Sequence, residues 1–252
     1  MAAAGIAGLA PLKTASALAG TADDRQYLEL RHYQPLTGPN RSRLEDFLRD
    51  AALPAWNRLG ITPVGVFSVA YGPNAPSLYV LLPHPTLDAV LSARDHLVAD
   101  EAYQRDGATF LSATLADPAF VRMESRLLRA FSGMPRIEAP AREPRIFELR
   151  IYESHSESAA RRKIEMFNEG GEIEIFRKTG LTPVFFGETI IGPLMPNLTY
   201  MITFENMEAR DRQWDVFVND PAWKTISSNP YYSGTVSNIT DFILRPTGYS
   251  QI

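Results

Sequence analysis

The stretch Leu28-Glu-Leu-Arg-His-Tyr33 returns 119 residues later as Phe147-Glu-Leu-Arg-Ile-Tyr152. Three further pairs follow in the same order, each 120 residues apart: Leu59-Gly-Ile-Thr-Pro-Val64 with Thr179-Gly-Leu-Thr-Pro-Val184, Gly72-Pro73 with Gly192-Pro193, and Asp100-Glu-Ala-Tyr103 with Asp220-Pro-Ala-Trp223. Ordered matches at a nearly constant spacing indicate an internal repeat. The chain is therefore predicted to be a tandem duplication of one structural unit.

The repeat divides the chain into two units, residues 24–134 and 145–252. Between them, residues 135–144 (PRIEAPAREP) contain three prolines and no periodicity, which is typical of a stiff linker. Residues 1–23 are rich in alanine and glycine and include Ala15-Ser16-Ala17, the form that a signal peptidase cuts. This segment is either a simple tail or the remainder of an export signal, so we expect an exported or periplasmic protein, with a cytoplasmic location as the alternative.

Each unit has the same predicted order of elements. A strand (27–33, 146–152) precedes a helix (42–59, 158–179), which ends at Gly60 or Gly180 as helices often do. A β-hairpin follows (64–71 with 78–82, 184–191 with 198–204), then a second helix (87–98, 207–218) and a last strand (121–131, 236–244). The order βαββαβ is the ferredoxin-like pattern, an α+β fold.

The middle strands predict how the units meet. Leu198, Tyr200 and Ile202 alternate with Thr199 and Met201, so the strand is largely apolar on both sides. A sheet with one wet face alternates cleanly between apolar and polar residues. The second face of each sheet must therefore be covered, and the simplest arrangement packs it against the equivalent face of the other unit. This predicts a barrel-type pseudo-dimer with a central cavity, formed within one chain or between two.

Composition excludes several classes of function. Hydrophobic residues make up 45% and charged residues 21% of the chain, the net charge is −4, and no dense basic run is present, so we expect no nucleic-acid partner. No cysteine is present, which removes thiolate metal sites, and the four histidines have no metal-ligand spacing. We expect no metal, no cofactor and no transmembrane segment, because Gly-rich phosphate loops and long apolar runs are also missing.

The second unit resembles the NIPSNAP family, which belongs to the dimeric α/β-barrel superfamily. The resemblance rests on the Phe147 to Tyr152 strand, Gly180-Leu-Thr-Pro-Val184, Arg210-Asp-Arg-Gln-Trp214 and Asp220-Pro-Ala-Trp223. The first unit departs from it, with Val90-Leu-Ser-Ala-Arg94 in place of the Arg-x-x-x-Trp element. The resemblance implies a barrel pairing, an interior small-molecule site and a homo-oligomer. It implies no agreed reaction, because the superfamily includes cofactor-free monooxygenases, isomerases, cyclases, haem-degrading enzymes and members with no known catalysis.

The first strands supply the candidate chemistry. Leu28, Leu30, Phe147, Leu149 and Ile151 fall on the face predicted to meet the helices. The opposite face, predicted to line the cavity, carries Glu148 as a base, Arg150 as a holder of a carboxylate or enolate, and Tyr152 as a donor to an oxyanion. Ligand-binding candidates are Glu29, Arg31, Tyr33, Glu188 and Tyr200. The alternative is that each Glu pairs with the Arg two residues on and only seals the pseudo-dimer.

Arg210 and Trp214 lie four residues apart on one helix face. We interpret Trp214 as a core residue, Arg210 as a surface or helix-end pairing residue, and Asp220 with Trp223 as a cap and its packing partner. The sequence thus predicts a small-molecule-binding NIPSNAP-like barrel protein, with two classes of function left open. It is either a cofactor-independent enzyme of monooxygenase, isomerase or cyclase type, or a non-catalytic binding or assembly scaffold. Because only the second unit keeps the family elements, we expect Arg150 to contribute more to ligand binding than Arg31.

Overall fold

The computed structural model describes residues 24–36 and 38–252. The predicted tail or export signal, residues 1–23, lies outside the described residues. The first unit consists of β1 (Tyr27–Gln34), α1 (Pro39–Phe47), the π-helical turn η1 (Leu48–Ala52), α2 (Leu53–Arg58), β2 (Gly65–Tyr71), β3 (Leu78–His84), α3 (Leu87–Ala99), α4 (Glu101–Asp106), α5 (Ala108–Leu111) and β4 (Arg122–Ala130). The second consists of β5 (Ile146–Glu153), α6 (Glu157–Asn168), α7 (Glu172–Lys178), β6 (Thr182–Ile191), β7 (Asn197–Phe204), α8 (Met207–Asn219), α9 (Pro221–Ser227) and β8 (Asn238–Pro246).

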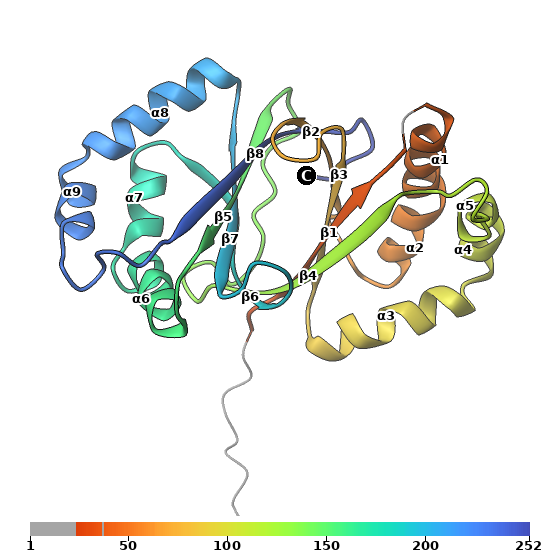
Figure 1. Ribbon diagram of the computed structural model, residues 1–252, viewed down its shortest axis with the longest axis horizontal. Coiled ribbons are helices and arrows are strands. Elements are labelled where there is room, and N and C mark those ends of the chain that lie inside the picture. The colour runs from red at the N-terminus through yellow and green to blue at the C-terminus, as the bar shows by residue number, and fades with distance from the viewer. Residues whose placement is uncertain (1–23, 37) are drawn as a thin grey trace, which may run out of the picture.

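The eight strands form one closed antiparallel barrel in the order β1-β3-β2-β8-β5-β7-β6-β4 (Figure 1). Each unit contributes four neighbouring strands, β4-β1-β3-β2 and β8-β5-β7-β6, which is the ferredoxin-like order. The two sheets join along their edges, where β2 pairs with β8 and β4 pairs with β6. The predicted α+β pseudo-dimer of two tandem ferredoxin-like units is confirmed, and the two units pair within a single chain.

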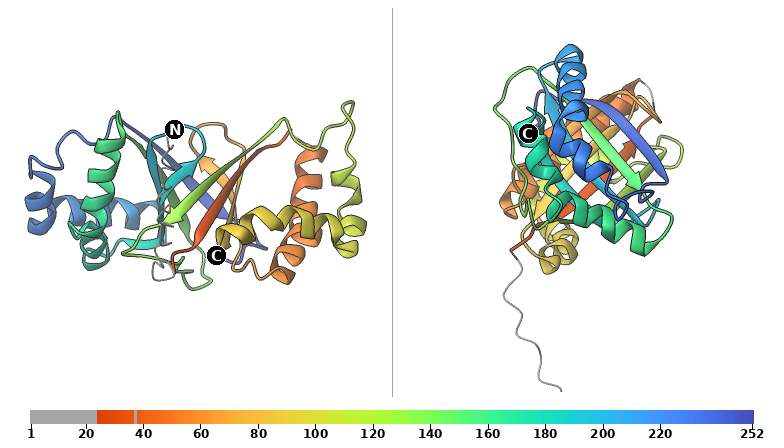
Figure 2. Two further views of the ribbon diagram at one scale, coloured as in Figure 1. Left: turned by 90° about the horizontal axis from the view of Figure 1, so that it is seen from below. Right: turned by 90° about the vertical axis from the view of Figure 1, so that its left-hand side faces the viewer.

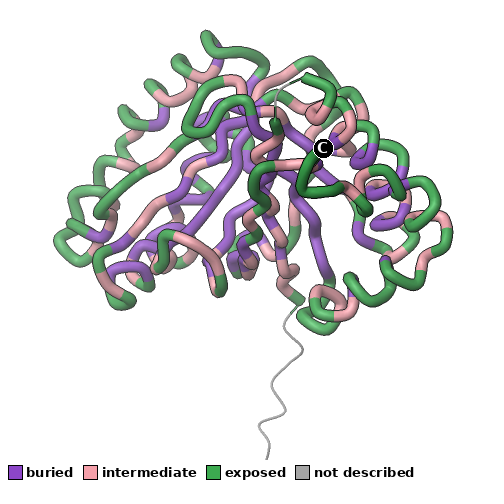
Figure 3. Tube along the Cα trace, turned by 45° about the vertical axis from the view of Figure 1, so that its right-hand side comes forward, coloured by how far each residue is buried: buried purple, intermediate pink, exposed green. Residues whose placement is uncertain are grey.

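The helices of the two units lie at opposite ends of the molecule, with the barrel between them (Figures 1 and 2). Buried chain runs through the central strands, and exposed chain follows the outer helices (Figure 3). Apolar side chains from all eight strands meet in one cluster inside the barrel, while two further clusters fill the space between each unit's strands and its own helices. The structure therefore has three cores rather than one.

The first helix of each unit is interrupted, and the interruption explains the slip in the repeat. In the first unit the π-helical turn η1 connects α1 to α2, whereas in the second unit α6 ends before Gly170 and α7 begins after Gly171. Gly171 has a φ of 83°, which favours glycine. The spacing between matching residues changes from 119 to 120 across this break, so the extra residue is accommodated where the helix is already irregular.

The predicted helix start after Asp220 is also confirmed. The Asp220 side chain accepts a hydrogen bond from the backbone N–H of Ala222 at 2.8 Å, with Pro221 in the first turn of α9. Within residues 24–36 and 38–252, no helix has the length and the apolar character needed to cross a membrane.

Candidate functional site

The predicted orientation of the first strands is wrong. Phe147, Leu149 and Ile151 of β5 point into the barrel, where Phe147 packs against Phe67 of the first unit with ring centroids 4.9 Å apart. The alternate residues, beginning with Glu148, point outward to the helices instead. The same holds for β1, whose Leu28 and Leu30 lie in the barrel cluster, while Tyr33 packs against α1 and α2. The barrel interior is thus an apolar core, and the polar face of each first strand lies beneath the helices.

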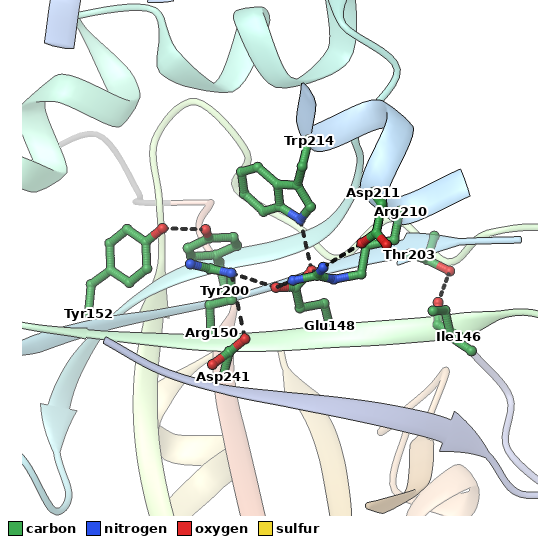
Figure 4. Close-up of polar contacts among 10 residues, drawn as sticks. All are labelled: Ile146, Glu148, Arg150, Tyr152, Tyr200, Thr203, Arg210, Asp211, Trp214 and Asp241. Carbon is green, nitrogen blue, oxygen red and sulfur yellow. Dashed lines mark hydrogen bonds and ion pairs between the residues drawn. The ribbon is translucent and has the colours of Figure 1, made fainter. Parts of the chain in front are cut away.

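Glu148 is the centre of a hydrogen-bond network that connects β5 to α8 (Figure 4). Its carboxylate is fully buried and accepts hydrogen bonds from Arg210 Nε at 2.8 Å, Arg210 Nη2 at 2.9 Å and Trp214 Nε1 at 2.9 Å. Arg150 Nη1 donates a fourth hydrogen bond to the same carboxylate. Arg210 and Trp214, which the sequence analysis interpreted as a pairing residue and a core residue, therefore belong to the same arrangement as Glu148 and Arg150.

This network fixes the charge of Glu148. Burial alone would raise the pKa of the Glu148 carboxyl, but the hydrogen bonds from Arg210, the charge of Arg150 and the hydrogen bond from Trp214 outweigh it and hold the pKa below its usual range. A carboxylate that accepts four hydrogen bonds and has a lowered pKa is a weak base. Glu148 therefore positions the two arginines, Arg150 and Arg210.

Arg150, the other arginine of the network, lies beside two aromatic rings. Its guanidinium carbon lies 4.9 Å from the Trp214 ring centroid and 5.5 Å from that of Tyr152, so two aromatic rings flank it. Arg150 Nη1 is 3.9 Å from Asp241 Oδ2, but the buried Nε has no hydrogen-bond acceptor within the described part of the chain. The Arg150 side chain is nevertheless 15% exposed, so part of it can be reached from outside the network.

Tyr152 and Tyr200 form a hydroxyl pair next to Arg150. Their oxygens are 2.9 Å apart, and their rings meet edge to face (Figure 4). Tyr200 is fully buried, and burial together with the neighbouring Tyr152 raises the pKa of its hydroxyl well above the usual value. Tyr152 reaches the opening, whereas Tyr200 lies behind it. Of the two predicted tyrosines, the structure gives direct access to Tyr152.

These side chains border a cleft of about 390 Å³ between β5 and helices α6 to α9. Its walls consist of charged and aromatic residues and one valine, from five elements: Arg150, Tyr152, Lys163, Glu172, Phe176, Arg210, Trp214, Phe217, Val218 and Trp223. Lys163 and Glu172 were not predicted, and they form a buried ion pair at 2.7 Å. The cleft lies outside the barrel, beneath the helices of the second unit.

The first unit has the same strand residues without the same partners. Arg31 pairs with Glu29 through two hydrogen bonds of 2.6 and 3.0 Å, and Ser125 Oγ donates a third to Glu29 at 2.8 Å. His84 Nε2 lies 3.6 Å from the same carboxylate. In place of Arg210 and Trp214 this unit has Val90 and Arg94, and Arg94 is exposed. The Glu–Arg pairing that the sequence left open as an alternative is thus present in both units.

Glu188 lies apart from the other predicted residues. It borders a separate hollow of about 200 Å³ together with Ala160, Met195 and Asn197, and that hollow shares no residue with the cleft at Arg150. Within the described ranges, no group of three or more His, Cys, Asp or Glu side chains could hold a metal ion.

A barrel of two ferredoxin-like units with helices on its outside defines a dimeric α/β-barrel protein. The NIPSNAP family model matches residues 28–135 and 147–251, so the chain belongs to the NIPSNAP family and carries two copies of its domain. No curated protein sequence matches the chain.

Solved structures share the fold at low sequence identity. A "putative monooxygenase" from Lactobacillus acidophilus NCFM is 11% identical with a TM-score of 0.59, over 88% of this chain and 94% of that one. An anthrone oxidase-like protein is 11% identical with a TM-score of 0.52, over 89% and 92% of the two chains. An uncharacterized NIPSNAP-like domain protein from Burkholderia xenovorans is 25% identical with a TM-score of 0.38, over 42% and 89%.

Proposed function

We propose that the second unit binds a small aromatic anion in the cleft between β5 and helices α6 to α9. The observation that carries the proposal is Arg150, whose guanidinium is flanked by two aromatic rings and whose partly exposed side chain borders the cleft. A carboxylate or an enolate oxygen is the natural partner for such a group.

The charges and the walls of the cleft support an anionic, planar ligand. The residues that line the cleft itself include three cations, Arg150, Arg210 and Lys163, and one carboxylate, Glu172. The aromatic walls, formed by Tyr152, Phe176, Trp214, Phe217 and Trp223, offer faces and edges for packing a ring. A cleft of this volume matches the size of small-molecule sites.

A binding cleft fits either class of function that the sequence left open. Two structural neighbours are described as a "putative monooxygenase" and as an "anthrone oxidase-like protein", and both descriptions belong to those proteins. For this chain, a cofactor-independent reaction is part of the proposal, since the cleft brings cations, the Tyr152 hydroxyl and the Glu172 carboxylate together.

The test is a calorimetric titration of the full chain with phenylacetate and with its neutral analogue phenylacetamide. We expect phenylacetate to bind more tightly, because only the carboxylate can pair with Arg150. Replacing Arg150 with Gln should weaken phenylacetate binding about 10- to 150-fold, the effect of losing a charged hydrogen bond of about 1.5 to 3 kcal/mol. The matched control is Arg31→Gln in the first unit, which should leave binding unchanged.

Two results would contradict the proposal. Equal losses in the Arg150 and Arg31 variants would mean that both units bind the ligand or that neither arginine contacts it. Equal affinity for phenylacetate and phenylacetamide would mean that the site does not recognise a negative charge. The predicted homo-oligomer and the predicted export stay predictions, which light scattering and N-terminal sequencing of the mature protein would test.

A further inference from the structure

Lys163 of α6 and Glu172 of α7 form a buried ion pair in the wall of the cleft. Lys163 Nζ donates a hydrogen bond to Glu172 Oε2 at 2.7 Å and lies 3.4 Å from the sulfur of Met166. The two residues are only 4% and 2% exposed. Lys163 Nζ also lies 4.6 Å from the Phe167 ring centroid and 5.7 Å from that of Trp223. The hydrogen-bond network around Glu148 uses neither of these two charges.

The first unit shows that the fold does not need this pair. Lys163 corresponds to Leu44, 119 residues earlier, and Glu172 corresponds to Ala52, 120 residues earlier. Both counterparts are fully buried in the core between the first unit's strands and helices. A buried ion pair loses hydration that an apolar pair does not lose, so it is weak evidence for stability. A charged pair that borders a cleft, where the sister unit has leucine and alanine, points to chemistry.

Lys163 and Arg150 both lie beside the Tyr152 ring. The Arg150 guanidinium carbon is 5.5 Å from the Tyr152 ring centroid, and Lys163 Nζ is 5.8 Å from it. Both also border the cleft. A ligand whose carboxylate pairs with Arg150 therefore shares the cleft with Lys163 and Glu172. An aromatic 2-oxo acid carries a ring, a carboxylate, a ketone and an acidic C–H bond within this short span.

We infer that Lys163 and Glu172 are the acid–base pair of the cleft and catalyse enolisation of an aromatic 2-oxo acid held by Arg150. This inference rests on the proposed function of the cleft. The Glu172 carboxylate removes a proton from the carbon beside the ketone, and the C–H electron pair becomes the C=C bond. The carbonyl electron pair moves to oxygen, where the Lys163 ammonium stabilises the enolate. Return of the proton restores the ketone, so the step needs no oxidant, reductant or other co-reactant.

The electrostatics of the pair suit this role. Burial raises the pKa of the Glu172 carboxyl, while the charge and hydrogen bond of Lys163 oppose the rise. A carboxylate with a raised pKa is a stronger base than one in water. Arg150 and Lys163 both carry positive charge beside the developing enolate, which favours its formation in a site sheltered from water.

The test follows exchange of the benzylic protons of phenylpyruvate with D2O by NMR, using the full chain. We expect the wild type to accelerate exchange and the variants Glu172→Gln and Lys163→Met to lose about 100-fold or more of it, as general acid–base catalysis predicts. The double variant Lys163→Leu/Glu172→Ala copies the first unit. It should keep or raise the melting temperature and also lose exchange.

Calorimetric titration with phenylpyruvate separates this inference from the proposed function. Wild-type binding without accelerated exchange, or unchanged exchange in Glu172→Gln, overturns the acid–base inference and leaves the binding cleft in place. A double variant that fails to fold would show that the pair is structural and would also overturn the inference. Absence of phenylpyruvate binding overturns the ligand class, and absence of phenylacetate binding as well overturns the proposed function.

Discussion

Replacement of Glu148 with Gln should destabilise the protein more than any change at the surface of the same network. Glu148 is fully buried and holds Arg150, Arg210 and Trp214. Removing one partner of a buried ion pair typically costs about 3 to 5 kcal/mol. The side chains of Arg150 and Arg210 are 15% and 19% exposed, so water can reach part of each, and we expect about 3 kcal/mol, near the lower end of that range.

The assay is urea denaturation at pH 7, with thermal unfolding alongside. A loss of about 3 kcal/mol corresponds to a fall in melting temperature of about 6 to 12 °C for a chain of this size. The matched control is Asp211→Asn, because Asp211 pairs with Arg210 at 3.0 Å but is largely exposed, and it should change stability by less than about 1 kcal/mol. A loss below about 1 kcal/mol for Glu148→Gln, equal to the control, would refute the view that Glu148 organises the site.

Two further predictions concern the first unit. The pKa of Glu29 is lowered from 4.5 to about 2, since burial, which would raise it, is outweighed by His84, Arg31 and Ser125. Because the pKa is lower in the folded state, ionised Glu29 stabilises the protein above pH 4.5, and this stabilisation is lost as the pH falls toward 2. The free energy of unfolding of the wild type should therefore fall by about 2 kcal/mol between pH 7 and pH 3 because of this group. In urea denaturation over the same pH range, the free energy of unfolding of Glu29→Gln should fall by about 2 kcal/mol less than that of the wild type. The same pH dependence in both proteins would contradict the lowered pKa of Glu29. Residues 24–134 alone should not remain a soluble monomer in light scattering, because Leu28, Phe67 and their neighbours would expose the apolar barrel face. A well-behaved monomer would contradict this expectation.

Much of the fold could be predicted because the repeat gives two independent copies of each pattern. The strand at Leu28 and its copy at Phe147, and the turns at Gly72 and Gly192, gave the order of elements, which the structure confirms. The closure of the barrel depends on long-range pairing of β2 with β8 and of β4 with β6. No local sequence pattern indicates pairing between strands so far apart in the chain. The sequence could therefore indicate only that the second apolar face of each sheet is covered.

The orientation of the first strands could not be predicted from alternation alone. Alternation separates Glu148 and Arg150 from Phe147 and Leu149, but it does not say which set faces the helices. The polar set seemed incompatible with a helix-covered face. That face accepts Glu148 because α8 brings Arg210 and Trp214 to its carboxylate. Burial of a charge depends on its partners, and these come from another element.

The residues of the cleft could be predicted only in part. Arg150 and Tyr152 were grouped from the sequence, and both border the cleft. Lys163 and Glu172 were missed, since a lysine and a glutamate on helices usually lie in solvent. A signal was available in the comparison of the two units, where these charged residues stand opposite Leu44 and Ala52. Differences between the copies of a duplicated unit thus point to candidate residues that the shared residues do not show.

The central claim is that the ligand lies under the helices of the second unit and not inside the barrel. A crystal structure of the full chain with phenylpyruvate tests it most directly. We predict ligand density in the cleft, with the carboxylate within hydrogen-bond distance of the Arg150 guanidinium and the ketone facing Lys163. Ligand density inside the barrel, among Phe67, Phe147 and Met201, would contradict the placement of the ligand in the cleft.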